Sequence, residues 1–127
     1  MPGPVETAIR THVQAGACLP TPTGRATFVV DELGATELVL LLGPKRTRTP
    51  FAWTCIEGIP GFLQDLGWIR VGANRDIRGM PGTLDGYLKR CVKRQTADYI
   101  AVVLESAGVV ELDRRRPACV RLTRPAG

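Results

Sequence analysis

The chain has 127 residues but only one histidine, His12, and none of its four cysteines forms a C-x-x-C pair. Zinc sites are built mainly from such pairs and from histidine, so we expect no metal site. The sequence also lacks a glycine-rich phosphate loop and a nucleophile elbow. Asp31 and Glu32 are the only adjacent acids on which a metal-dependent nuclease could be built. We therefore expect neither an enzyme nor a bound cofactor.

Long hydrophobic runs are missing too. The longest strongly apolar run is residues 38–42, whereas a membrane-spanning helix needs about 20 apolar residues. The beginning of the chain does not show the basic-then-apolar pattern of a secretory signal. The cysteines stand far apart among mostly apolar neighbours, which predicts buried, reduced thiols. We expect a cytoplasmic protein without a membrane partner, with reduced thiols at Cys18, Cys55, Cys91 and Cys119.

Positive charge is concentrated in the second half of the chain. The formal net charge is +5, yet residues 1–69 hold 5 Lys and Arg against 6 Asp and Glu. Residues 70–127 hold 12 Lys and Arg against 6 Asp and Glu. A one-sided basic excess favours an anionic partner, and nucleic acid is the commonest such partner.

Residues 1–78 predict a small, strand-rich N-terminal lobe with short helices. Phe28 to Val30 and the apolar run ELVLLL favour two strands joined as a hairpin. His12 is expected to be half-buried, Leu66 to face inward, and Trp53 and Trp68 to belong to the core. The expected helices are 5–17, 52–59 and one opened by Pro60. The expected strands are 25–33, 37–42, 47–51 and 68–71. Residues 19–24 contain two prolines and are expected to be a loop that joins a helix to a strand.

Residues 79–127 predict a helix-turn-helix followed by a wing. Thr83 is a good N-cap for a first helix that continues to Arg94, and Gln95 with Thr96 forms the turn. A second helix then continues to Gly108, with Val102 on its outer face. Residues 109–112 and 118–122 are the wing strands, and Glu111 pairs with Arg121 across them. Together with the N-terminal lobe, this order predicts an α+β fold in one compact unit.

The candidate DNA-binding residues are basic or polar side chains near the two helices and at exposed tips. Three consecutive arginines at the wing tip are too many for salt-bridge duties alone, and arginine suits a phosphate backbone or a narrow minor groove. The tip at residues 45–48 is either a solvated hairpin end or an auxiliary phosphate contact. The candidates are Lys89, Arg90, Lys93 and Arg94 at the first helix, Gln95, Thr96 and Tyr99 at the second, Arg114, Arg115 and Arg116 at the wing, Arg75 and Arg78 in the loop between lobes, and Lys45, Arg46 and Arg48 at the hairpin tip.

The segment LESAGVVEL, followed by a charged tip and then VRLT, resembles the MarR-type winged-helix family. The resemblance implies a winged helix that contacts duplex DNA. The matching residues are Leu104, Gly108, Val109, Val110, Arg114, Arg115, Arg116, Leu122 and Thr123. The chain departs from that family because it lacks a long dimerisation helix and carries Asp98 and Glu105 on its second helix.

The first hypothesis is therefore a non-catalytic DNA-binding domain, either a transcription regulator or a targeting module that acts with an effector domain. One alternative is a module that reads DNA modification in a restriction enzyme, because a small strand-rich lobe joined to a winged helix is similar to such modules. Another alternative is a protein-interaction winged helix. In that case the docking face would be Asp98, Tyr99, Val102 and Glu105.

Overall fold

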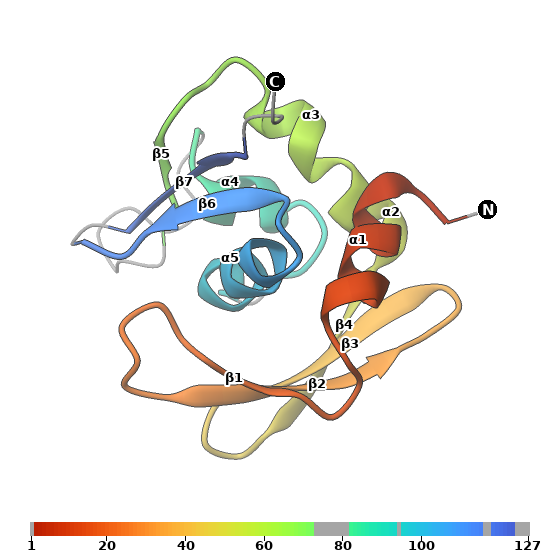
Figure 1. Cartoon of the computed structure of the whole chain (residues 1–127). Coiled ribbons are helices and arrows are strands. Elements are labelled where there is room, and N and C mark those ends of the chain that lie inside the picture. The colour runs from red at the N-terminus through yellow and green to blue at the C-terminus, as the bar shows by residue number, and fades with distance from the viewer. Residues whose placement is uncertain (1, 73–81, 94, 116–117, 124–127) are drawn as a thin grey trace.

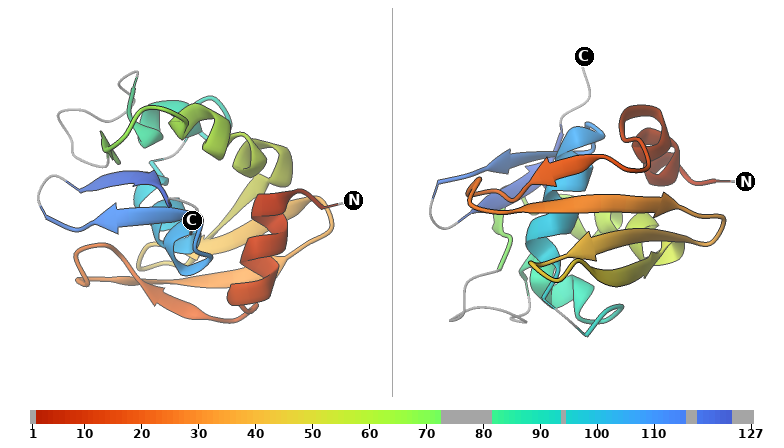
Figure 2. Two further views of the ribbon diagram at one scale, coloured as in Figure 1. Left: turned by 45° about the horizontal axis from the view of Figure 1, so that its top comes forward. Right: turned by 90° about the horizontal axis from the view of Figure 1, so that it is seen from below.

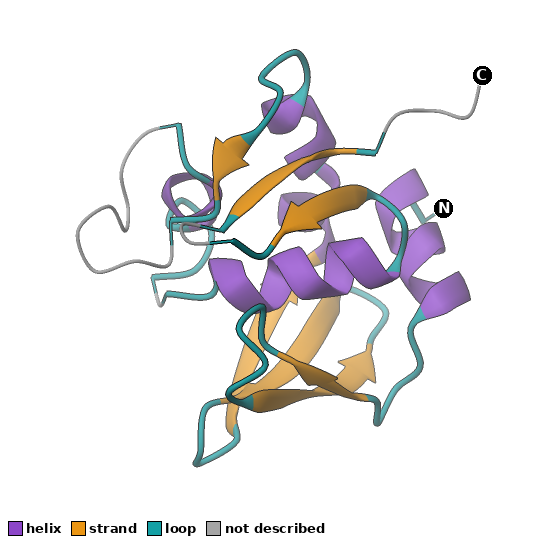
Figure 3. Cartoon of the chain, turned by 60° about the vertical axis from the view of Figure 1, so that its left-hand side comes forward, coloured by secondary structure: helices purple, strands orange, loops and turns teal. Residues whose placement is uncertain are grey.

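Two antiparallel sheets lie on opposite sides of one central helix, α5 (Figures 1 and 3). The computed structural model describes residues 2–72, 82–93, 95–115 and 118–123. Among these residues, no helix has the length and apolar character needed to cross a membrane. In chain order the elements are α1 (Pro4–His12), β1 (Cys18–Pro20), β2 (Thr27–Leu33), β3 (Glu37–Leu42), β4 (Thr47–Ala52), α2 (Trp53–Glu57), α3 (Ile59–Leu63), β5 (Ile69–Arg70), α4 (Leu84–Leu88), α5 (Ala97–Ser106), β6 (Val110–Asp113) and β7 (Cys119–Leu122).

The first sheet has the strand order β1-β2-β3-β4 and comes from the first half of the chain. The predicted hairpin of β2 and β3 is confirmed, with Leu33 opposite Leu38 next to the turn. The prediction that residues 19–24 form only a joining loop is wrong at its start, because Leu19 pairs with Phe28 in strand β1. Pro20 is tolerated there because it ends an edge strand, where its missing N–H breaks no ladder.

The second sheet has the order β5-β7-β6 and joins the predicted wing to a strand from the expected N-terminal lobe. The wing hairpin is confirmed, with Val110 opposite Leu122 and Glu111 opposite Arg121. Ile69 of β5 pairs with Val120 of β7. One cluster of buried side chains extends from Val5 to Val120, so both sequence segments share a core.

Helix α5 is buried on more than one side. Ile100, Ala101, Val103 and Leu104 are fully buried, and Val102 is only 2% exposed. The prediction that Val102 lies on an exposed outer face is therefore wrong. A helix that is apolar all round packs inside a protein, and the run IAVVL has this character. The elements α4, α5, β6 and β7 follow the expected helix-helix-hairpin order, but the first sheet covers the side of α5 opposite the wing (Figure 3).

Two helices are shorter than the sequence predicts. Helix α1 ends at His12, whose side chain is exposed rather than half-buried, because the chain becomes extended at Val13 and buries that residue instead. Helix α4 is capped as expected by Thr83, whose Oγ1 accepts a hydrogen bond from the Gly86 N–H. It ends at Leu88, and turns follow instead of the expected continuation to Arg94.

Leu66 and Trp68 are exposed, at 46% and 45%, so the prediction that both face the core is wrong. Asp65 and Gly67 both have left-handed backbone angles, with φ of 64°, and this conformation ends the helical turn before Leu66. The Trp68 ring is instead covered by the Arg121 guanidinium, whose Cζ lies 4.5 Å from the ring centroid. Trp53 is 5% exposed, which confirms its place in the core.

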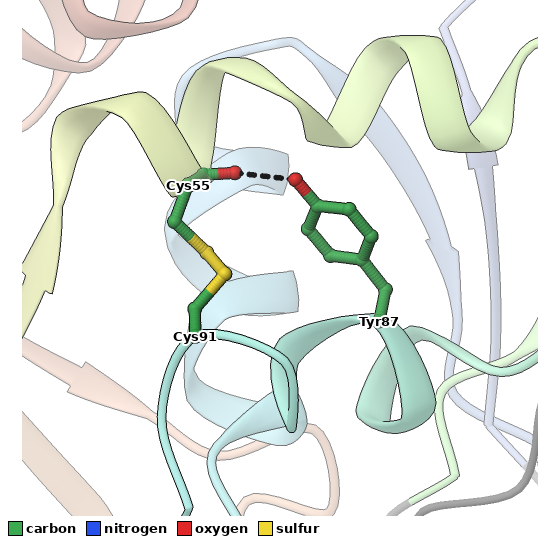
Figure 4. Close-up of a disulfide and its surroundings, with 3 residues drawn as sticks. All are labelled: Cys55, Tyr87 and Cys91. Atoms are coloured by element: carbon green, nitrogen blue, oxygen red, sulfur yellow. Dashed lines mark hydrogen bonds between the residues drawn. A yellow bond between two sulfur atoms is a disulfide. The ribbon is translucent and has the colours of Figure 1, made fainter.

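A disulfide joins Cys55 of α2 to Cys91, just after α4 (Figure 4). The prediction of reduced thiols is therefore wrong for this pair, whereas Cys18 and Cys119 keep their thiols. The prediction of burial is wrong for Cys18 and Cys91, which are exposed. The two cysteines are 36 positions apart in the chain, and only the packing of α4 against α2 brings their Cα atoms within 6.3 Å. Sequence spacing alone could not reveal that contact.

Candidate nucleic-acid interface

The N-terminal end of α5, the expected reader of bases, is largely enclosed. Thr96 is 1% exposed, and its Oγ1 has no hydrogen-bond partner among the described residues. The ring of Tyr99 packs edge-on against Phe28 of β2, with centroids 5.2 Å apart. Gln95 is half-buried. The first sheet thus occupies the side of Tyr99 that would have to face a DNA groove.

An acid adds to this unfavourable setting for DNA. Asp98 lies in the first turn of α5 and is half-buried. Burial raises the pKa of its carboxyl group, and the nearby negative charge of Asp85 raises it further. When Asp98 is ionised, its charge repels phosphate from this end of the helix. Both the packing and the charge therefore disfavour base reading by α5.

Residues 89–93, which we call the connector, carry three of the expected phosphate contacts in the turns after α4. Lys89 Nζ donates a hydrogen bond to the Lys93 carbonyl oxygen at 3.0 Å. Arg90 and Lys93 are exposed and form no ion pair with any acid that the structure describes. Arg94 lies outside the described residues. The connector thus offers two solvated cations and a third whose ammonium group caps a carbonyl.

Three contacts hold α4 and the connector on α2 and α3. The first is the Cys55–Cys91 disulfide, and the second is a hydrogen bond of 2.8 Å from Tyr87 Oη to the Cys55 carbonyl oxygen (Figure 4). The third is stacking of Tyr87 on Phe62, with centroids 5.0 Å apart and planes 28° apart. Gly58 makes this approach possible, since a Cβ at that position would collide with Tyr87 Oη.

The two described arginines of the wing tip are both paired with acids, contrary to the expectation that they exceed salt-bridge duties. Arg114 donates two hydrogen bonds to the Glu105 carboxylate of α5, one of them 2.6 Å long. Arg115 Nη2 lies 2.8 Å from Asp113 Oδ2. The hydrogen bonds from Arg115 lower the pKa of Asp113 to about 2. Arg116 lies outside the described residues.

These wing pairs lie at the surface, where ion pairs contribute little stability. The side chain of Arg115 is 90% exposed and that of Arg114 is 44% exposed. An exposed pair is worth about 0–1 kcal/mol, so a phosphate can replace the carboxylate at small cost. The hydrogen bond to Glu105 raises the pKa of Arg114 further, so this guanidinium stays charged at any physiological pH. The wing therefore remains a candidate phosphate contact, but a locally neutralised one.

A second basic group lies at the β1–β2 and β3–β4 turns of the first sheet. Arg46 donates hydrogen bonds to the Thr27 carbonyl oxygen and Oγ1, at 2.6 and 2.9 Å. Arg48 Nη2 lies 3.8 Å from Glu37 Oε1. Lys45 and Arg25 are exposed and unpaired with any described acid. Of the three basic residues expected at the hairpin tip, Arg46 and Arg48 are therefore paired and Lys45 is solvated. Arg25 in the β1–β2 turn is a further solvated cation that is not among the sequence candidates.

The two turns of the first sheet and the wing share one side of the molecule. The β1–β2 turn and the β6–β7 hairpin extend to the left in Figure 1, with the β3–β4 turn below them, and all three lie on the left in both panels of Figure 2. The Arg46–Thr27 hydrogen bonds tie the two turns of the first sheet together. The sequence did not reveal this grouping, because Arg25 becomes part of a hairpin turn only once β1 is recognised.

Two further sets of sequence candidates make no site. Arg75 and Arg78 lie outside the described residues. Asp31 and Glu32 are exposed on β2 beside a bulge between Val30 and Glu32. In the described part of the chain, no group of three His, Cys, Asp or Glu side chains is arranged to hold a metal ion.

No protein-family model, no curated protein and no solved structure matches this chain. The function of the protein must therefore be inferred from the charges, burial and contacts of its residues.

Proposed function

We propose that this protein binds duplex DNA through phosphate contacts made by exposed basic turns, as a regulator or a targeting module. The observation that carries this proposal is a set of solvated cations on surface turns. Arg25, Lys45, Arg90 and Lys93, which we call the basic turns, form no ion pair with a described acid. Such cations can exchange counterions for phosphates without first breaking a salt bridge.

The burial of α5 defines what kind of DNA binding to expect. Phosphate contacts position a protein on a duplex, whereas base contacts in a groove provide sequence specificity. Val102 is buried and Tyr99 packs on Phe28, so α5 presents no free face for the major groove. Affinity should therefore depend strongly on salt and weakly on sequence. Val102 is also one of the four residues of the docking face expected for a protein-interaction winged helix, and its burial weighs against that alternative.

Fluorescence anisotropy with a labelled 20-base-pair duplex tests this proposal. At low salt we expect Lys45→Ala to weaken binding about two- to fivefold, the size of one lost phosphate contact of about 0.5–1 kcal/mol. Arg70→Ala removes the same charge from strand β5, outside the basic turns, and should leave the affinity unchanged. Equal losses in the two variants would show that only net charge matters and would refute the assignment to the turns.

The same assay separates backbone binding from the reading of DNA modification. Duplexes of unrelated sequence, with and without methylated bases, should bind within about threefold of one another if phosphates supply the affinity. A preference of 100-fold or more (about 2.7 kcal/mol) for a methylated duplex would instead identify a modification reader.

A further inference from the structure

We propose that the Cys55–Cys91 disulfide is a redox switch that sets the DNA affinity of the connector, with the oxidised protein as the tighter binder. This regulation rests on the function proposed above. The bond joins a buried cysteine of α2 to an exposed cysteine in the middle of the connector, between Arg90 and Lys93. It therefore fixes the backbone that carries Arg90 and Lys93, two of the four cations of the basic turns.

Few other contacts hold the connector in place. Its described backbone hydrogen bonds all lead to α4. The N–H groups of Lys89 and Arg90 donate to the carbonyl oxygens of Asp85 and Tyr87, and those of Cys91 and Val92 donate to the Leu88 carbonyl oxygen. The Lys89–Lys93 hydrogen bond lies within the connector itself. Tyr87 anchors α4 to α2 but precedes the connector, and within the connector only Val92 packs against the core, half-buried, among the described residues. The disulfide is thus the one described covalent tie between the connector and α2.

The chemistry of release is thiol–disulfide exchange with a dithiol reductant. A thiolate of the dithiol attacks the Cys91 sulfur, because Cys91 is exposed whereas Cys55 is 8% exposed. A mixed disulfide forms at Cys91, and Cys55 leaves as a thiolate that takes up a proton. The second thiol of the reductant then displaces Cys91 and forms the reductant's own disulfide. Two electrons pass to the protein, which gains two thiols.

Release should weaken binding by removing preorganisation. In the oxidised protein the connector backbone is already fixed when Arg90 and Lys93 meet phosphate. In the reduced protein, binding must first order that segment, which costs affinity without removing any charge. We expect the duplex Kd to rise about 10-fold on reduction, while the net charge and the other basic turns stay the same.

Limited trypsin digestion tests the switch without DNA. Lys89, Arg90 and Lys93 are cleavage sites inside the connector, and Arg25 and Lys45 are sites outside it. With dithiothreitol, cleavage at the connector should accelerate about 10-fold or more relative to the sites outside it, because local opening exposes its backbone. Fragments are separated on a reducing gel after the protease is quenched, and intact mass confirms the gain of two hydrogen atoms. Equal cleavage of both forms overturns the proposal.

Duplex anisotropy with and without dithiothreitol completes the test. Cys91→Ser should bind as the reduced protein does under both conditions, provided that circular dichroism shows it folded. Cys18→Ser removes an exposed thiol outside the disulfide and should respond to reductant as the wild type does. Equal affinity of the oxidised and reduced wild type overturns the switch. Redox-dependent cleavage with no duplex binding in either form refutes the proposed function, while the release of the connector stands.

Discussion

Replacement of Val102 by alanine distinguishes a buried α5 from a surface recognition helix. The side chain is 2% exposed, so the substitution removes two buried methyl groups. At about 0.8 kcal/mol for each group, the transfer loss is about 1.6 kcal/mol. The cavity left behind adds to this loss, and we expect the free energy of unfolding to fall by roughly 2–3 kcal/mol. A residue on an exposed helix face would change it by no more than about 0.5 kcal/mol.

Urea denaturation followed by circular dichroism provides the measurement. With a slope of about 2 kcal/mol per molar urea, the midpoint should fall by about 1–1.5 M at an unchanged slope. Ser106→Ala is the matched control, because Ser106 is exposed at the end of the same helix. A midpoint shift for Val102→Ala no larger than that of the control would refute the burial of α5.

Three further substitutions test other parts of the account. Gly58→Ala should lower the free energy of unfolding by about 1–3 kcal/mol in urea melts, because the new methyl group collides with Tyr87 Oη. Gly61→Ala is the control: a Cβ there meets nothing within 4 Å and should not destabilise the fold. The folded state raises the pKa of Asp98 above its ordinary value of 3.8, so it binds more protons than the unfolded state just above that value, and stability falls as pH rises. Asp98→Asn should remove this contribution to the fall, which melts at pH 4 and pH 7 check; an unchanged pH dependence contradicts it. Asp113 has a pKa of about 2 and stays ionised at all physiological pH values. Asp113→Asn removes the charge that pairs with Arg115 and should tighten duplex binding about two- to fivefold in low-salt anisotropy. No gain would show that Arg115 already exchanges freely between Asp113 and phosphate.

The parts of the fold that follow from local pattern could be predicted from the sequence. The run ELVLLL occupies residues 37–42 as strand β3, as expected for an apolar segment in a sheet interior. Thr83 caps α4 through its side chain, and Glu111 pairs with Arg121 across the wing. Each of these features depends on residues close in sequence or joined by a short turn.

The features that the sequence did not predict depend on contacts between distant segments. A helix with polar residues at Asp98 and Glu105 looks amphipathic, but its wider surroundings are two sheets that cover both sides. The pairing of Cys55 with Cys91 requires α4 to pack on α2, which no local pattern encodes. Trp68 lies at the surface, where its ring contacts Arg121 from far along the chain. The candidate interface changed for the same reason, from a reading helix to exposed turns.

The salt dependence of duplex binding shows whether the four exposed cations of the basic turns contact phosphate. The measurement compares the wild type with a variant in which Arg25, Lys45, Arg90 and Lys93 are all replaced by alanine. Each phosphate contact contributes about 0.9 to the slope of log K against log salt concentration, so four lost contacts should make the slope shallower by about 3.6. If the two proteins show the same slope and the same affinity, the basic turns do not contact DNA and the proposed function is wrong.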